Sequence, residues 1–365
     1  MISRLFDLLA RRIDGPLMAA LALTLALGVT VVYSASGGLG ADRVMGQGRN
    51  LALAVFALWL FAQVHPQLLM RLALPAYLAG LALLVAVALF GEIRNGARRW
   101  LHLGMATIQP SEIMKIAVPL VLAWWFHRRE EGLRLLDFVI AAVILVLPVG
   151  LIVRQPDLGT ALLIFASGFF VIFLAGLSWK VIGSMTVAGL ASLPFLWSMM
   201  HDYQRQRILT LLDPMQDPLG AGYHIIQSTI AIGSGGILGK GWLNGTQAQL
   251  DFVPERSTDF ILAVFGEEFG LVGNVILLVL YLLIIGRGLM IAANASTVFA
   301  RLTAGAITLT FFTYAFVNMG MVSGILPVVG VPLPMISYGG TALLSILAGM
   351  GILMSISTHK QLVSS

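Results

Sequence analysis

Long apolar runs separated by short polar segments recur along nearly the whole chain. A helix needs about 20 mostly apolar residues to cross a bilayer, and the runs approach that length. No segment shows the alternation over about ten residues that is typical of outer-membrane strands. The expected fold is therefore all-α and polytopic, with residues 1–365 forming one membrane-embedded domain. We predict ten spans, near residues 17–33, 50–64, 72–90, 112–126, 137–153, 159–175, 181–200, 260–285, 302–322 and 336–357.

Composition agrees with this pattern. Of the 365 residues, 58% are hydrophobic and 11% are charged, against about 25% charged in soluble domains, which excludes a water-soluble globule. The absence of cysteine excludes disulfides, thiolate catalysis and cysteine-ligated metals. The net charge of +5 is spread over the loops between apolar runs, so we expect no nucleic-acid partner.

Lysine and arginine indicate how the chain is oriented. An even number of spans places both termini on one side, and that side collects eleven basic residues against six in the short loops opposite. The positive-inside rule therefore predicts cytoplasmic termini and an external long loop, residues 201–258. Three of the six exceptions, Arg94, Arg98 and Arg99, lie between Gly91 and Pro110. This local excess indicates a function such as holding an anion.

A glycine-rich segment, residues 232–241, invites comparison with phosphate-binding loops. It lacks their spacing, because Ser234 and Gly241 stand where such a loop needs glycine and a hydroxyl residue. We predict a backbone packed tightly against helices. Amide groups donated to a bound pyrophosphate remain the alternative.

Charged residues near or inside the predicted spans are the first candidates for a site. Glu112 and Lys115 stand three residues apart in the fourth span, so their side chains are neighbours on a helix. Charges within a span mark a functional site by default. The alternative is a self-neutralising pair with Ser111 as a helix cap.

Two aspartates fall where predicted helices begin on the external side. Asp157 follows a proline, and helix capping would explain it equally well. Asp259 is expected in the first turn of the eighth span, capped by Ser257 or Thr258. Glu267 and Glu268 follow inside that span and are expected to bond neighbouring helices or to line a cavity.

Several segments closely resemble the SEDS (shape, elongation, division and sporulation) glycosyltransferases. They reach from the third predicted span to the end of the chain, and the motifs Tyr-His-Ile-Ile-Gln, Gly-Lys-Gly-Trp and Val-Val-Gly-Val-Pro resemble the elongation rather than the division branch. The matching residues are 95–100, 111–112, 155–160, 203–219, 223–228, 232–241, 252–260 and 324–341.

The resemblance implies an enzyme that polymerises lipid II into β-1,4 glycan strands outside the bacterial inner membrane. Its implied partners are a class B penicillin-binding protein transpeptidase and other elongation-complex membrane proteins. The essential family aspartate falls on Asp259, which we expect to be the general base of one inverting displacement. Glu112, Lys115 and Asp157 match further family positions. Should Asp259 not be the base, the next candidates are Glu255, Asp157, Asp251 and the imidazoles of His201 and His224.

Lipid II carries a pyrophosphate on a long isoprenoid, so its binding needs cations and an apolar lateral groove. A divalent cation, Mg²⁺ or Mn²⁺, held by Asp157 or Glu112, could share the charge, and no organic cofactor is expected. The remaining expected substrate-binding residues are Arg98, Arg99, Arg205, Arg207, Lys240 and Glu255.

Two other functions stay open from sequence. A flippase or transporter of lipid-linked precursors would also need charges in the membrane, although transporters tend to place their sites at the midplane. The other is a noncatalytic scaffold for the transpeptidase, which predicts that polymerisation survives loss of Asp259.

Overall fold

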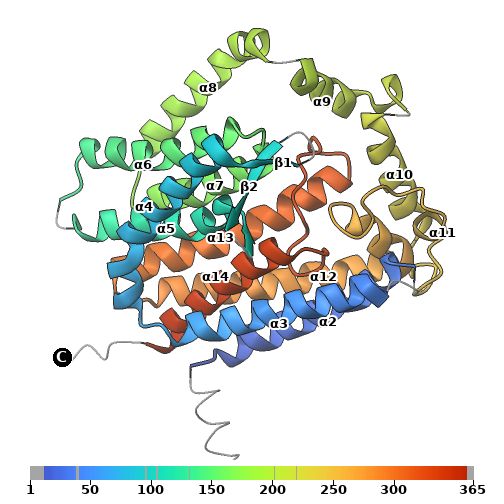
Figure 1. Cartoon of the computed structure of the whole chain (residues 1–365), viewed down its shortest axis with the longest axis horizontal. Helices are drawn as coiled ribbons and strands as arrows, with labels where there is room; N and C mark the ends of the chain where they lie inside the picture. The colour runs from blue at the N-terminus through green and yellow to red at the C-terminus, as the bar shows by residue number, and fades with distance from the viewer. Residues whose placement is uncertain are drawn as a thin grey trace, which may run out of the picture.

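The computed structural model describes residues 12–37, 41–94, 97–103, 106–130, 132–200, 202–218 and 220–359. In this part of the chain a long helix lies at each of the ten predicted spans (Figure 1). They are α2 (Gly15–Ala35), α3 (Ala41–Gln63), α4 (Pro66–Phe90), α5 (Pro110–His127), α6 (Leu135–Val153), α7 (Leu158–Leu174), α8 (Trp179–Met199), α12 (Ile261–Ala293), α13 (Val298–Val322) and α14 (Gly340–Thr358). The predicted all-α, polytopic class is confirmed.

Seven of these helices, found within the described residues, are long and apolar enough to cross a membrane: α2, α3, α4, α6, α12, α13 and α14. Helix α7 is apolar but has 17 residues. The protein is a multi-pass membrane protein. Among these seven helices, α13 and α14 are the most enclosed, because 67% of the residues in the most apolar stretch of each are buried. They form the centre of the bundle.

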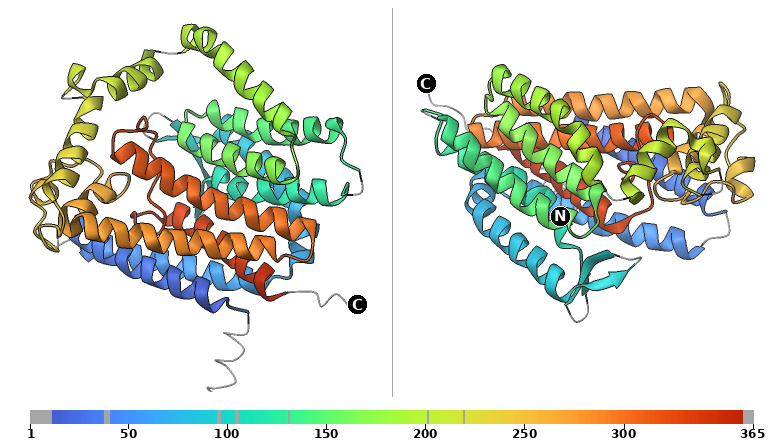
Figure 2. Two further views of the ribbon diagram at one scale, coloured as in Figure 1. Left: turned by 180° about the vertical axis from the view of Figure 1, so that it is seen from behind. Right: turned by 90° about the horizontal axis from the view of Figure 1, so that it is seen from above.

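The arginine-rich segment after α4 is not a plain loop. It forms a three-stranded antiparallel sheet in the order β1 (Glu92–Arg94), β2 (Ala97–Leu103) and β3 (Ala106–Ile108). The pattern of apolar runs does not predict these short strands. They are a small addition to the helical fold. In Figure 2 the sheet projects from the bundle at the end of α4.

The long connection between α8 and α12 is largely helical. It contains α9 (Asp202–Leu212), the 3₁₀ turn η1 (Pro214–Gln216), α10 (Ala221–Ser234) and α11 (Thr246–Gln249). Helix α10 packs on α12, and Ser228 Oγ donates to the main-chain oxygen of Val322 at 2.9 Å. This connection packs against the bundle at its α10–α11 end, while α8 and α9 arch outward (Figures 1 and 2).

Helix α12 is broken at Gly270, which has φ 62° and ψ −158°. The break exposes backbone groups that lipid could not satisfy, and the glycine-rich segment supplies their partners. The main-chain amides of Lys240 and Gly241 donate to the main-chain oxygens of Glu267 and Glu268 at 2.9 and 3.0 Å. In return, the amides of Leu271 and Val272 donate to the main-chain oxygens of residues 236 and 237.

The glycines of this segment are required by the close approach. A Cβ placed on Gly235 would lie 2.1 Å from the main-chain oxygen of Gly266, and one on Gly239 would lie 2.1 Å from that of Glu268. Gly239 also has φ +78°, in the left-handed region that favours glycine. The prediction of a tightly packed backbone is confirmed, and the amides of Lys240 and Gly241 are used within the protein.

Candidate active site

A cavity of about 720 Å³ lies where the start of α5, the start of α7 and the segment before α12 meet. Five of the residues singled out from the sequence line it: Arg99, Glu112, Lys115, Asp157 and Asp259. The other walls come from the glycine- and proline-rich segment between α13 and α14, including Gly330, Pro332 and Tyr338. Residues as far apart in the chain as Arg99 and Tyr338, which are separated by 239 positions, therefore line one polar cavity.

Asp259 lies in a turn just before α12, whose N-cap residue is Phe260. The sequence predicted Asp259 inside the first helical turn with a side-chain cap. That placement is wrong, because neither Ser257 nor Thr258 caps the helix; Thr258 Oγ1 instead donates to Glu255 Oε2 at 2.8 Å. Asp259 thus precedes the helix and its carboxyl group reaches the cavity.

The main chain around Asp259 is held from two sides. Asn318 Nδ2, from α13, donates to the main-chain oxygen of Asp259 at 2.8 Å and to the main-chain oxygen of Val331 at 2.7 Å. Ser337 Oγ donates to the Thr258 oxygen at 2.6 Å. These bonds connect the turn to the α13–α14 segment, so the position of the aspartate depends on both.

The environment of Asp259 favours its neutral form. Burial of the carboxyl group, followed by the negative charge of nearby Glu255, raises the pKa of Asp259 to about 6. A helix N-terminus favours the charged form of a nearby carboxyl group, but at Asp259 the effect of burial prevails. A carboxylate with this pKa is a better proton acceptor than an ordinary aspartate and is still largely ionised at pH 7.

Lys115 and Glu112 form the predicted pair. Lys115 Nζ lies 2.7 Å from Glu112 Oε1, and both side chains are largely buried. Ser345 Oγ from α14 donates to the other Glu112 oxygen at 2.7 Å. Ser111 is not the cap, because Gln109 is the N-cap residue of α5, and the Gln109 side chain makes no capping hydrogen bond.

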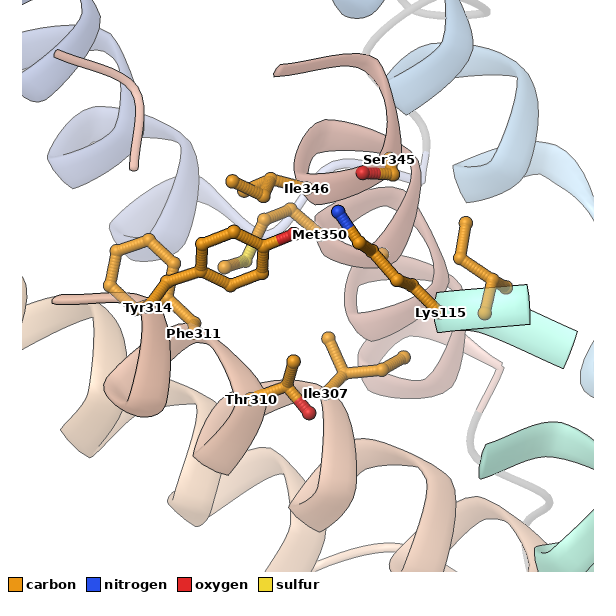
Figure 3. A pocket seen from close by; sticks show the side chains of 10 residues that line it. Lys115, Ile307, Thr310, Phe311, Tyr314, Ser345, Ile346 and Met350 are labelled. Carbon is orange, nitrogen blue, oxygen red and sulfur yellow. The ribbon is translucent and has the colours of Figure 1, made fainter. Parts of the chain in front are cut away.

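Tyr314 on α13 completes the surroundings of Lys115. The ammonium lies 5.2 Å from the centre of the Tyr314 ring. Figure 3 shows the Lys115 amine and the Tyr314 hydroxyl directed into one small chamber, beside Ser345. Lys115 lines both this chamber and the Asp259 cavity, so its charge lies at the boundary between them.

Asp157 serves as a helix cap and also lines the cavity. Its Oδ1 accepts from the Thr160 amide at 3.2 Å, which confirms the capping expected at the start of α7. Its Oδ2 lies 3.7 Å from Arg99 Nε and 3.5 Å from Gln109 Nε2. Capping uses only Oδ1, so Oδ2 remains to pair with Arg99, and both residues line the cavity.

The other expected substrate-binding residues are not among those lining this cavity. Lys240 Nζ bonds Glu267 Oε1 at 2.7 Å, and Arg205 bonds main-chain oxygens at the end of α8. Arg98 is exposed on β2, Glu255 is exposed beside Thr258, and the side chain of Arg207 lies outside the described part of the structure.

Of the alternative bases, Asp157 lines the Asp259 cavity, whereas two others lie elsewhere. His224 on α10 stacks near Phe260, with ring centres 5.4 Å apart, and burial lowers its pKa although Glu255 opposes this. Asp251 pairs with Arg256 at 2.6 Å. His201 lies outside the described residues. Neither His224 nor Asp251 is among the described residues that line the Asp259 cavity.

An apolar groove of about 860 Å³ adjoins the site. It runs between α3, α4, α5 and α14, and its lining includes Phe61, Leu72, Ile113 and Leu344. Glu112 lines both the groove and the Asp259 cavity. The polar Asp259 cavity therefore adjoins a lateral apolar surface, which is the arrangement expected for binding a lipid-linked substrate.

The sequence pattern does not identify Asn318, Tyr314 and Ser345 as residues of the site. Each lies in an apolar span and is buried, and a buried amide or hydroxyl there needs a partner. That is the signal that could have identified them. Asn318 bonds main-chain oxygens of Asp259 and Val331, and Ser345 bonds Glu112 on α5. These partners are distant in the chain and are visible only in three dimensions.

Comparison with known proteins agrees with the geometry. The family of cell cycle proteins that comprises FtsW, RodA and SpoVE matches residues 16–362. The chain is 53% identical over 355 residues to the peptidoglycan glycosyltransferase MrdB of Escherichia coli, covering 96% of this chain and 95% of the relative. It is 36% identical over 358 residues to the probable peptidoglycan glycosyltransferase FtsW of Geobacter metallireducens, covering 94% of each.

Solved structures give the same result. A chain from a study of how a peptidoglycan synthase complex coordinates polymerization and crosslinking matches with a TM-score of 0.81 and 34% identity, over 96% of this chain and 99% of that one. The Rod shape determining protein RodA of Thermus thermophilus matches with a TM-score of 0.71 and 30% identity, over 94% and 96%.

Proposed function

Since this chain belongs to the SEDS family, the cell cycle proteins that comprise FtsW, RodA and SpoVE, we propose that it is a peptidoglycan glycosyltransferase of cell elongation that polymerises lipid II into β-1,4 glycan strands. The observation that carries this proposal is the cavity in which the partly buried Asp259 carboxyl meets Lys115 and Arg99. The enzyme names of the relatives support it. The chain acts as one membrane-embedded unit, residues 1–365.

The proposed reaction is one inverting displacement. The acceptor sugar hydroxyl attacks the anomeric carbon of the donor, and its proton passes to the Asp259 carboxylate. The bond from that carbon to the pyrophosphate oxygen breaks, and the lipid pyrophosphate leaves with the electron pair. Lys115 and Arg99 stabilise the charge of the leaving group, while Glu112 and Ser345 hold Lys115 in place.

The isoprenoid chains occupy lateral apolar surfaces, of which the groove beside Glu112 is one. Holding the tails in the membrane restricts the sugars to the membrane boundary, where Asp259 lies before the start of α12. Arg98, Arg205, Lys240 and Glu255 do not line the Asp259 cavity, so any contact they make with the substrate is at the periphery of this site.

A divalent cation is a further part of the proposal. Within the described residues, no three His, Asp or Glu side chains are grouped to hold a metal ion. A cation bound mainly by pyrophosphate needs only one or two protein carboxylates, and Asp157 or Glu112 would supply them. Chelation with EDTA should then lower polymerisation, and Mg²⁺ or Mn²⁺ should restore it.

The cavity faces outward in the bacterial inner membrane, and both termini are cytoplasmic. The charge distribution supports this orientation. The natural lack of cysteine makes a test simple, because a single cysteine can be placed at the exposed Gln216. Labelling from the external side is expected, and labelling only from the cytoplasmic side would contradict it.

The proposed partner is a class B penicillin-binding protein transpeptidase, within the membrane complex that elongates the wall. Support comes from the related chain in a synthase complex that coordinates polymerization and crosslinking. The cognate partner should raise the polymerisation rate of the purified chain. Equal rates with and without it would remove the activation.

Polymerisation of lipid II by the purified full chain, without ATP, tests the activity itself. Products are separated by size on a gel, and translocation of fluorescent lipid II is measured in parallel in liposomes. Glycan strands support the proposal, whereas translocation without strands would favour the flippase. Strand synthesis that survives loss of Asp259 would instead support a different base or a contaminating enzyme.

A further inference from the structure

Helix α5 ends in two successive stacks of arginine on tryptophan. The Arg128 guanidinium lies 4.8 Å from the centre of the Trp124 ring, and that of Arg129 lies 3.3 Å from Trp125. Each pair is four residues apart, about one helical turn, so the two stacks lie side by side. This is the left-hand end of the bundle in Figure 1, opposite α10 and α11.

The two stacks differ in charge balance. Arg129 Nε is 2.7 Å from Asp137 Oδ1 on α6, so its charge is neutralised within the protein. Arg128 makes no ion pair with any described residue and is exposed. Stacking fixes the plane of its guanidinium and leaves the N–H groups at the edge free to donate.

Arg128 lines an open cavity of about 1190 Å³ between α4 and α5. Arg71 from α4 lines the same cavity and is likewise without an ion pair in the described part of the chain. The nearby carboxylate of Glu130 is held by His127 at 3.0 Å. The remaining walls are mostly apolar and consist of Met70, Leu74, Pro75, Trp124 and His127.

The position of this cavity across the membrane is set by α5. Arg128 follows Glu112 by 16 residues, about 24 Å along a helix, which approaches the thickness of the hydrocarbon core. Tryptophan is typical of the boundary between membrane and water. The cavity therefore has cations at the water boundary opposite the Asp259 cavity, and apolar walls facing the lipid.

We propose that this cavity binds the headgroup of an anionic phospholipid from the inner leaflet. The Arg128 fork donates to the phosphate, Arg71 supplies the second positive charge, and the acyl chains lie along the apolar wall of α4. The apolar wall and the boundary position distinguish a lipid from free phosphate, which would need neither. The inner-leaflet assignment rests on the orientation proposed above, whereas the site itself does not depend on the enzymatic activity.

The test uses the full chain purified in a neutral detergent, with thermal stability measured as each probe is titrated. The probes are phosphatidylglycerol, phosphatidylcholine and inorganic phosphate. Phosphatidylglycerol should stabilise the wild type, and Arg128→Gln and Arg71→Gln should each weaken its apparent affinity about fivefold, the change for roughly 1 kcal/mol per basic residue. Arg301→Gln, which removes an exposed charge at the start of α13 outside this cavity, is the matched control.

Four outcomes would overturn the proposal. They are no stabilisation by phosphatidylglycerol, equal stabilisation by phosphatidylcholine, equal stabilisation by inorganic phosphate, or an equal loss of affinity in Arg301→Gln. If one arginine variant does not fold, the other gives the result, because Arg71 and Arg128 lie on different helices. Loss of the lipid effect with polymerisation intact separates this site from the proposed active site.

Discussion

The side-chain amide of Asn318 donates to the main-chain oxygen of Asp259 at 2.8 Å. Asn318 is fully buried in α13, and the same nitrogen donates to Val331 in the segment after that helix. Both protons of one amide group thus connect the turn that carries the proposed base to the wall of its cavity. The aspartate is positioned through its backbone, which leaves its carboxylate free to exchange a proton.

Replacing Asn318 by leucine should therefore lower kcat in a protein that still inserts into the membrane. Two main-chain oxygens would lose their donor, at a cost of about 1–3 kcal/mol each, and a shift of about 1 Å in a catalytic group can cost about 100-fold in rate. Asn294→Leu at the exposed end of α12 is the matched control. Wild-type kcat in Asn318→Leu would contradict the positioning role.

The Glu112–Lys115 pair should show strong coupling. Breaking a buried pair leaves one uncompensated charge and costs about 3–5 kcal/mol, so Glu112→Gln and Lys115→Met should each reduce thermal stability. The double variant should recover much of the stability but not polymerisation, since the leaving group loses its cation. If both single variants are stable and fully active, the pair has no role in the site.

Polymerisation should depend on the ionisation of Asp259. A general base must be deprotonated, so the rate should rise with pH through about 6 and fall about tenfold per unit well below it. Glu255→Gln removes a negative charge that raises this pKa, and the midpoint should move to lower pH. A pH–rate profile of both proteins checks this. A midpoint unchanged in Glu255→Gln would contradict the electrostatic explanation.

Lys240 should matter for stability rather than for chemistry. It neutralises Glu267, whose side chain is fully buried and also accepts from the amides of Gln247 and Ala248. Lys240→Met should lower thermal stability while the folded fraction keeps its kcat, and adding Glu267→Gln should restore stability. A stable but inactive Lys240→Met protein would instead support a role in binding pyrophosphate.

The helices could be predicted because each membrane span is a continuous apolar run in the sequence. The break in α12 could not, because Gly270 in an apolar run gives no sign of its own conformation. Its backbone partners lie in the glycine-rich segment some 30 residues earlier. The sheet after α4 was missed for a related reason, since three short strands are stabilised mainly by pairing with each other.

The site was predictable where its residues are close in the chain. Glu112 and Lys115 are three apart on a helix, so their contact follows from spacing. That Arg99 and Asp157 join them depends on how β2 and α7 pack, which spacing does not record. From the sequence, Lys240 could be identified only as a cation available to bind the substrate's pyrophosphate. Its actual partner is Glu267, whose burial is visible only in the folded structure.

The central claim is that Asp259 is the general base, and the direct measurement is lipid II polymerisation by purified Asp259→Asn. Asparagine has nearly the same shape but cannot accept the proton, so the rate should fall by about 10² to 10⁴. Folding, membrane insertion and partner binding should remain, because the backbone bonds from Asn318 do not involve the carboxylate. Glycan strands formed at close to the wild-type rate would contradict the claim.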